Sequence, residues 1–317
     1  EYGQKTILAY MQFMKQTAAD KIGSLLQKFD GMDETVKDEL DDGTLLQLKA
    51  KIQKDKLYLD FTGTAPVHPN TMNANKAIVK SAILYVLRCL LNENIPLNEG
   101  VLQPVELILP DCLLNPPAAG EACGRAAVSA GNVEISQKVC DLLLGAFNTA
   151  AASQGTMNNI VFGDESFGFY ETLGGGSGAT ESASGSSAVH THMTNTRLTD
   201  IEIIEQKYPV KIVEFGVREK SGGPGAQCGG DGLFRVYEFQ KEVELSIISQ
   251  RRKTRPYGLK GGDSGMAGIN FLRRKQESEW HKLPSVCHLK CLPGDCLKVL
   301  TPGGGGFGPS GTVREKP

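Results

Sequence analysis

The sequence predicts an α+β fold, with a helix-rich first half that includes a β-hairpin and a strand-rich second half. In several segments before residue 150, apolar residues recur every three or four positions, as in amphipathic helices. Apolar and polar residues alternate over residues 45–61 and over long stretches after residue 205, as in strands. The two patterns do not alternate with each other along the chain, which argues against repeating βαβ units.

Three helices are expected in the first half. Residues 5–29 carry one apolar stripe, which predicts an amphipathic helix. Residues 75–91 are apolar on nearly all sides, which predicts a buried central helix. A third helix begins at "GNVEISQ", where Asn132 can cap free N–H groups and Glu134 suits the positive end of the helix dipole.

The strand patterns begin at residue 45 with a hairpin that turns at "KDK". Later, "KIVEFGVRE" and "LFRVYEFQKEVELSIIS" alternate cleanly, and "VCHLKCLPGDCLKVL" predicts a hairpin that turns at residues 293–295. The stretch "GGGSGATESASGSS" (residues 174–187) has the composition of a flexible linker. We therefore expect residues 1–185 to form a mixed part with central buried helices, and residues 186–317 to form a β-rich part.

Charge and cysteine content point to a protein of the cytoplasm. The chain has 34 basic and 36 acidic residues, so we expect no nucleic-acid partner, and we interpret the basic runs at 251–253 and 273–275 as solvated strand ends or turns. The longest apolar run is interrupted by Arg88, so no membrane partner is expected. Cys89 and Cys140 fall in apolar helical patterns and are expected to be buried free thiols, as in a reducing compartment.

Familiar catalytic motifs explain little of the sequence. No stretch matches the phosphate loop of nucleotide-binding proteins. "GDSGM" (262–266) is similar to the nucleophile segment of trypsin-like proteases, but its surroundings are typical of a plain turn. Residues Cys287, His288, Cys291 and Cys296 do not have the paired spacing of structural zinc sites, and small apolar thiols on a hairpin are the favoured interpretation.

The segment "SAVHTHMTNTR" (187–197) places His190 and His192 two residues apart, on one face if the segment is a strand. Two imidazoles alone do not make a metal site, but either could carry a proton to or from a leaving nitrogen. A hydrogen-bonded pair that supports a pocket is the third alternative, and the spacing alone favours it slightly. "AASQGTMNN" (151–159) and "GNVE" gather uncharged donors that suit either an amide ligand or ordinary capping.

The order of these segments is more specific than any one of them. "DFTGT", "LNEG", "AVSAGNVEISQ", "AASQGTMNN" and "GFYETLGGGSGA" precede "SAVHTHMTNTR", "REKSGGPG", "RRKTRPYGLKGG" and "TPGGGGFG". This series resembles the hydantoinase B/oxoprolinase family, and most closely its ATP-dependent 5-oxoprolinases. The resemblance implies a cyclic amidohydrolase that opens 5-oxo-L-proline to L-glutamate with ATP cleavage. An A-type half activates the lactam, and the B-type half, which this chain resembles, opens the activated ring with water.

The resemblance also implies what lies elsewhere. The B-type half of the family has a further N-terminal region with a metal-binding segment, so we expect this chain to be a C-terminal piece that is inactive alone. Both of its parts would belong to one hydantoinase B-type unit. ATP and a divalent metal are expected to bind mainly outside it. The implied partner is the A-type ATPase half, in the same chain or in another subunit, and we expect a homo-oligomer.

For the site, the resemblance favours His190 or His192 as a proton carrier, with no metal ligand in this chain. Asn132, Glu134, Asn158 and Asn195 are implied as substrate-binding or wall residues, and residues 174–178 as backbone packed close to the site. A fragment of a related hydantoinase or ketone carboxylase is an alternative, and so is a truncated module without catalytic activity.

Overall fold

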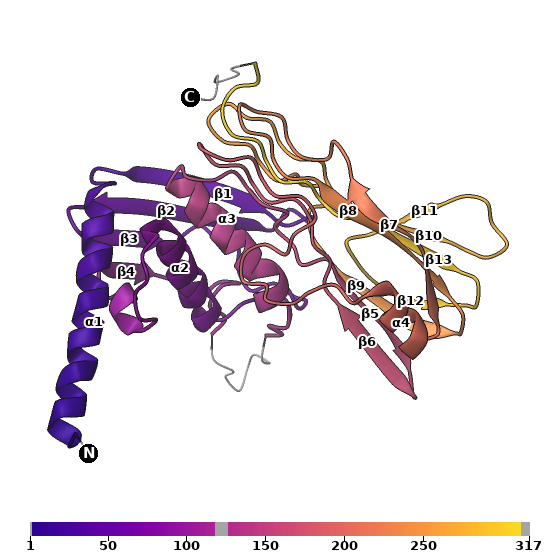
Figure 1. The fold of residues 1–317 in the computed structure, drawn as a ribbon, viewed down its shortest axis with the longest axis horizontal. Coiled ribbons are helices and arrows are strands. Elements are labelled where there is room, and N and C mark those ends of the chain that lie inside the picture. Colours follow the sequence, from indigo (N-terminus) through magenta and orange to yellow (C-terminus); the bar gives the residue numbers. More distant parts are fainter. Residues whose placement is uncertain (1, 118–125, 312–317) are drawn as a thin grey trace. The chain divides into compact units, whose positions relative to one another are not determined.

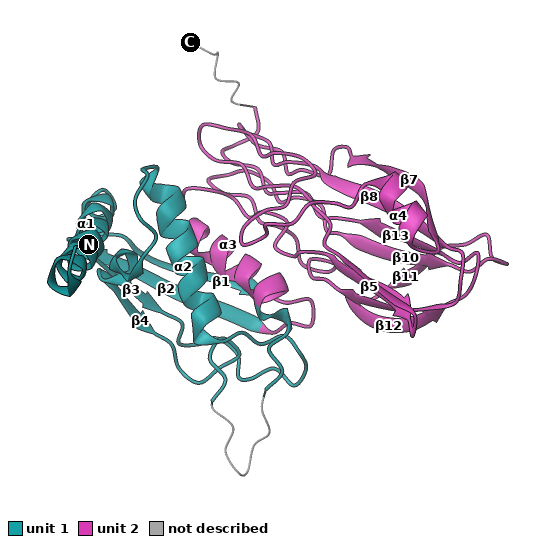
Figure 2. Ribbon diagram, turned by 60° about the horizontal axis from the view of Figure 1, so that its bottom comes forward, with its two compact units in different colours: residues 1–38, 45–131 teal, residues 39–44, 132–317 magenta. Residues whose placement is uncertain are grey.

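The computed structural model describes residues 2–117 and 126–311 (Figure 1). Cys123 therefore lies outside the described residues. Helices lie mostly in the first half and strands mostly in the second, which confirms the α+β prediction. The chain divides into two compact units, residues 1–38 with 45–131 and residues 39–44 with 132–317 (Figure 2). The expected division of the chain into residues 1–185 and 186–317 stays a prediction.

Unit 1 is built on a four-stranded sheet with the order β1-β2-β3-β4. The strands are β1 (Asp33–Glu39), β2 (Leu45–Gln53), β3 (Lys56–Asp60) and β4 (Val105–Ile108). β2 and β3 pair antiparallel around the turn between Gln53 and Lys56, which confirms the predicted hairpin, and β4 runs parallel to β3. Alternate apolar residues of β2 and β3 are fully buried, which is the usual stabilisation of a sheet with one covered face: Leu46, Leu48, Ala50, Ile52, Leu57 and Leu59.

The helices of unit 1 are α1 (Gln4–Gln27), α2 (Lys76–Leu91) and the short 3₁₀ helix η1 (Glu99–Leu102), and α1 packs against both of the others. The predicted stripe of α1 is buried only from Ala18 onward, and Leu8 and Met11 are exposed. Asn75 caps α2 by accepting a hydrogen bond from the N–H of Ile78. The expectation that α2 is buried all round is wrong, because only one face is buried, and Cys89 is accordingly exposed.

Unit 2 contains two sheets with a shared apolar core. One has the order β12-β9-β5-β6 and the other β11-β10-β13-β8-β7. Side chains from both sheets meet in one cluster that includes Phe162, Leu245, Tyr237 and Leu297, so the two sheets form a sandwich. The elements are β5 (Asn159–Asp164), β6 (Phe167–Glu171), α4 (Ile201–Lys207), β7 (Val210–Arg218), β8 (Gly232–Phe239), β9 (Val243–Ile248), β10 (Ile269–Arg273), β11 (His281–Leu283), β12 (Val286–Cys291) and β13 (Cys296–Leu300).

The predicted hairpin at residues 293–295 is wrong in its pairing. β12 pairs with β9 and β13 pairs with β8 and β10, so the two strands belong to different sheets. Asp295 stabilises the crossing because it accepts hydrogen bonds from the backbone N–H groups of Lys275 and Leu292 and from Arg274. The turn residues were identified correctly, but periodicity contains no information about which strand is the neighbour.

α3 (Ser136–Ala146) follows a π-helical turn, η2 (Gly131–Ile135). Every residue of α3 is buried, including the polar Gln137, Lys138 and Asp141. Buried polar side chains need hydrogen-bond partners, because an unpaired one costs about 1–3 kcal/mol. Lys138, for example, donates from Nζ to the backbone oxygen of Glu39 at 2.8 Å.

The glycine-rich stretch that begins at residue 174 is not a linker. Residues 173–176 are buried, and the segments near residues 151, 176, 230 and 304 lie side by side with backbone hydrogen bonds between them. A Cβ at Gly304 would lie 1.9 Å from the backbone oxygen of Ser177, and one at Gly176 would lie 1.9 Å from that of Gly230. Glycine is therefore required by the close approach of neighbouring backbones. Within the described ranges, no helix is long and apolar enough to cross a membrane.

Candidate functional site

The side chain of His192 lies beside a buried carboxylate. Its Nε2 is 3.5 Å from Oδ1 of Asp141, which is an ion-pair distance somewhat longer than a good hydrogen bond. The His192 side chain is 12% exposed and that of Asp141 is 0% exposed. Oδ2 of Asp141 is 3.3 Å from Nη2 of Arg251, and its Oδ1 accepts a hydrogen bond from the N–H of Ser153 at 3.0 Å. The carboxylate therefore lies between one cation and one imidazole.

Gln137 lies one turn before Asp141 on α3 and fixes the backbone that carries His192. Its Nε2 donates to the backbone oxygen of His192 and to the hydroxyl of Thr194, the latter at 3.1 Å. Its Oε1 accepts from the hydroxyl of Thr191 at 3.0 Å. His190 has a different setting, because its Nε2 is 3.1 Å from both the hydroxyl and the backbone oxygen of Thr172.

Glu134 is fully buried in η2, just before α3. Its Oε1 accepts hydrogen bonds from Nδ2 of Asn159 at 2.8 Å and from the N–H of Met157 at 3.3 Å. Burial raises the pKa of Glu134 to about 8, although the Thr156 hydroxyl and the positive charge of Arg252 act in the opposite direction. Glu134 is therefore a neutral acid through most of the physiological pH range.

Arg252 links Asn158 to the strands of unit 2. Its Nη1 donates to Oδ1 of Asn158 and to the backbone oxygen of Gln250, both at 2.7 Å, and its Nη2 donates to Oδ1 of Asn270 at 2.8 Å. Asn158 in turn donates to Oε1 of Gln154 at 2.8 Å. Burial lowers the pKa of Arg252 to about 10, so the guanidinium still carries its charge at neutral pH.

Asp41 fixes the backbone around Arg252. Its two carboxylate oxygens accept hydrogen bonds from three consecutive N–H groups, those of Arg252, Lys253 and Thr254, at 2.9, 2.9 and 3.2 Å. Its own N–H donates to Oε1 of Gln250 at 2.7 Å. The expectation that residues 251–253 are solvated is wrong for Arg251 and Arg252, which are 1% and 5% exposed because carboxylates and amides in the interior pair with them.

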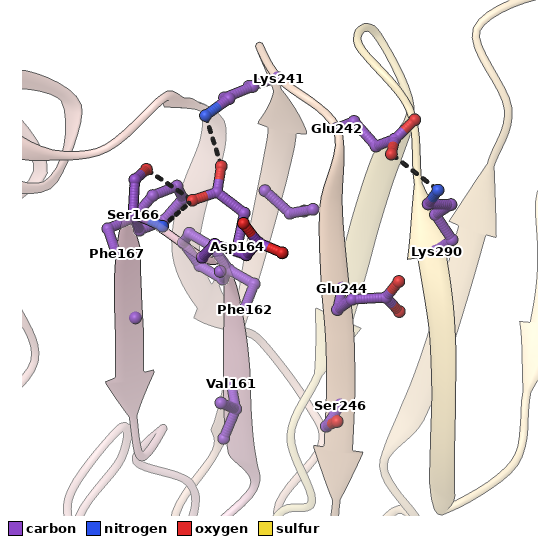
Figure 3. A pocket seen from close by; sticks show the side chains of 14 residues that line it. Val161, Phe162, Asp164, Ser166, Phe167, Lys241, Glu242, Glu244, Ser246 and Lys290 are labelled. Carbon is purple, nitrogen blue, oxygen red and sulfur yellow. Dashed lines mark hydrogen bonds and ion pairs between the residues drawn. The ribbon is translucent and has the colours of Figure 1, made fainter.

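A separate groove of about 950 Å³ lies on the outer face of the β12-β9-β5-β6 sheet (Figure 3). Lys241 forms an ion pair with Asp164 across it, and Lys290 forms one with Glu242 (Figure 3). None of the six site residues expected from the sequence lines this groove. Half-exposed ion pairs of this kind contribute little to stability, and we assign no chemistry to them.

The described side chains show whether this chain could bind a metal ion. Within residues 2–117 and 126–311, no three His, Cys, Asp or Glu side chains form a group that could hold a metal ion. The seven described cysteines are free thiols, and His288 is directed outward between Ser246 and Glu244. The described residues therefore do not fit a metal site.

The sequence model of the family described as hydantoinase B/oxoprolinase matches residues 1–310. The chain belongs to the hydantoinase B/oxoprolinase family. It is 44% identical to 5-oxoprolinase 1 of Arabidopsis thaliana and 42% identical to the 5-oxoprolinase of Saccharomyces cerevisiae, over 97% of its own length in each case. In both comparisons it spans 25% of the relative's length.

A solved relative in fold is the ATP-dependent caprolactamase of Pseudomonas jessenii. The TM-score is 0.84 at 20% sequence identity, and the match covers 99% of this chain and 58% of that one. At this identity the likeness concerns the fold alone. The hydantoinase B-type chain is thus similar in fold to a larger polypeptide over nearly all its described length.

Hydrogen bonds and ion pairs bring four of the six expected site residues into one polar region of this hydantoinase B-type chain. Glu134 and Asn158 are buried and linked through the 154–159 segment and Arg252, and His192 and His190 lie on the segment that Gln137 and Thr172 hold. Asn132 and Asn195 are exposed. Sequence reasoning missed Asp141, Arg251 and Arg252, although a charged residue within an apolar helical pattern was a signal available for Asp141.

Proposed function

We propose that this chain works as part of an ATP-dependent cyclic amidohydrolase of the 5-oxoprolinase type, which opens 5-oxo-L-proline to L-glutamate. The observation that carries the proposal is the identity of 44% and 42% to two 5-oxoprolinases over 97% of the chain. Since the chain spans about a quarter of those relatives, the activity is assigned to the whole polypeptide. We expect the chain alone to be inactive.

The chemistry requires an activated carbonyl, because an amide carbonyl is a poor electrophile. In the proposal the A-type half uses ATP for this activation, outside the present chain. Water then adds to the carbonyl carbon and the carbon–nitrogen bond breaks. The ring nitrogen leaves as an amine and must gain a proton, which a side chain that titrates near neutrality can supply.

His192 is the better candidate for this proton transfer. Its partner Asp141 is a carboxylate, which stabilises the imidazolium form, whereas Nε2 of His190 lies beside a hydroxyl and a carbonyl. In the proposal His190 supports the same segment. Asn132 and Asn195, which are exposed, present their amides to the substrate, while buried Glu134 and Asn158 form the wall behind them.

Histidine variants of the full-length enzyme test these roles. We expect His192→Ala to lower kcat for glutamate formation by about 10²–10⁴-fold, the usual contribution of a general acid or base. His190→Ala should lower it less. Full turnover in both variants would exclude a catalytic role for the pair, and a larger loss in His190→Ala than in His192→Ala would reverse the assignment.

The substrate class needs its own measurement. ADP release by the full-length enzyme should be coupled to 5-oxoproline rather than to hydantoin or to a ketone. Coupling to hydantoin or a ketone would instead favour one of the related enzymes of the family. Light scattering of the same preparation tests whether the enzyme is a homo-oligomer. Fractionation of the cells that make the enzyme tests whether it resides in the cytoplasm.

A further inference from the structure

We infer that Asp141 is a positioning residue that orients His192 and stabilises its charged form during ring opening. The inference rests on the proposed function, because it acts through His192. Asp141 reaches His192 from α3, which is buried along its whole length, so the carboxylate is placed by a rigid element.

The surroundings of Asp141 fix the position of its carboxylate. Arg251 provides an opposite charge at 3.3 Å and is itself 1% exposed, and the N–H of Ser153 donates to the same carboxylate at 3.0 Å. The hydroxyl of Tyr257 donates to the backbone oxygen of Asp141. Both carboxylate oxygens are therefore occupied, one by Arg251 and the other by Ser153 and His192.

This geometry suits an acid–base histidine. A carboxylate beside one ring nitrogen fixes the tautomer and the ring orientation, and it favours the imidazolium that forms when the ring takes up a proton. The backbone of His192 is fixed as well, because Gln137, one turn before Asp141 on α3, donates a hydrogen bond to its oxygen. The charged groups that face His192 in this arrangement are thus Asp141 and, behind it, Arg251. Asp141 contacts the imidazole and not the substrate, so its effect should appear in kcat rather than in KM.

Asp141→Asn in the full-length enzyme tests the inference. We expect kcat to fall at least about 10²-fold with KM for 5-oxoproline changed less than about threefold. Because the negative charge is lost, the limb of the pH–kcat profile that His192→Ala abolishes should move to lower pH.

Glu171→Gln is the matched control. Glu171 is also a buried carboxylate in an ion pair, 2.9 Å from Nη1 of Arg235, but its other hydrogen bonds come from Tyr237 and the N–H of Thr199 rather than from the His192 side chain. Its replacement should lower stability and leave the pH–kcat profile in place. A shift of the profile as large as that in Asp141→Asn would show a general effect of weakening the fold and would overturn the inference.

If Asp141→Asn does not fold, Asp141→Glu carries the test, because it keeps the charge and moves it by one methylene. We then expect a lower kcat with the pH limb unchanged, and wild-type kcat would overturn the positioning role. The two possible failures are distinguishable. Full turnover in His192→Ala refutes the proposed role of His192, whereas an inactive His192→Ala beside a wild-type Asp141→Asn refutes only the present inference.

Discussion

Asn159 donates a 2.8 Å hydrogen bond from Nδ2 to Oε1 of Glu134, and both side chains are buried. A second hydrogen bond from the same Nδ2 goes to the backbone oxygen of Ile248 at 2.8 Å, and the hydroxyl of Tyr170 donates to Oδ1 of Asn159. The amide therefore holds the acid against β5 and β9. An acid that is kept neutral in this way affects how the fold responds to pH.

Glu134→Gln should make the folded state less sensitive to pH. The pKa of Glu134 is about 8 in the folded state and about 4.5 in the unfolded chain, so folding takes up a proton between these pH values. Stability from this group is fully present below pH 4.5 and is lost as the pH rises toward 8, with a slope of up to about 1.4 kcal/mol per pH unit. Denaturant unfolding of the wild type and of Glu134→Gln at pH 5, 6, 7 and 8 checks this. Two parallel curves would contradict it.

Arg252→Met should destabilise unit 2 by about 2–6 kcal/mol, because it leaves the two buried acceptors of Asn158 and Asn270 without their donor, at about 1–3 kcal/mol each. The neighbouring Lys253 has an exposed side chain, so Lys253→Met is the matched control and should change stability by less than about 0.5 kcal/mol. Urea unfolding monitored by circular dichroism gives both values. Equal effects of the two substitutions would show that the buried network is not what stabilises the loop.

Gly304→Ala should cost more than about 3 kcal/mol or prevent folding, because its methyl group would lie 1.9 Å from a backbone oxygen that cannot move away easily. Gly168→Ala is the control, since nothing lies within 4 Å of the added carbon. Soluble yield and melting temperature of the two variants are the measurements. A folded Gly304→Ala with the stability of Gly168→Ala would contradict the close packing of these segments.

Leu26→Ala and Leu8→Ala compare how much the buried and the exposed halves of α1 contribute to stability. Leu26 is fully buried, so its truncation should cost about 2–5 kcal/mol through lost burial and a cavity. Leu8 is 56% exposed, and its truncation should cost less than about 0.5 kcal/mol. Thermal unfolding of unit 1 checks the difference. A large effect of Leu8→Ala in the isolated chain would show a contact absent from the described structure.

The sequence predicted elements well where one face of an element is buried. The alternation of Leu46, Leu48 and Ala50 is visible in the sequence, and so is the cap at Asn75, because each depends on neighbours in the chain. The pairing of β12 and β13 was predicted wrongly because strand partners are set by packing with distant segments. For the same reason the hydrogen bond between Arg252 and Asn158, which are 94 positions apart in the chain, could not be predicted from the sequence.

The candidate site, like the fold, could be predicted only in part from the sequence. Residue type and spacing drew attention to His192 and Glu134, but the choice between His190 and His192 needed their partners in space. Asp141 was passed over because an apolar helical pattern predicts a buried face and does not show which of the charged residues within it, Lys138 or Asp141, faces the histidine.

The backbones near Gly176, Gly230 and Gly304 pack in direct contact with one another, and this has a practical consequence for work with the protein. Residues 174–186 have the composition that usually invites an inserted epitope, a cleavage site or a fluorescent reporter. At the buried residues 174–176 such an insertion would enter the interior of unit 2 and push its neighbours apart, whereas residues 181–184 are exposed. Reporters belong instead on exposed turns such as the one at Lys54 and Asp55.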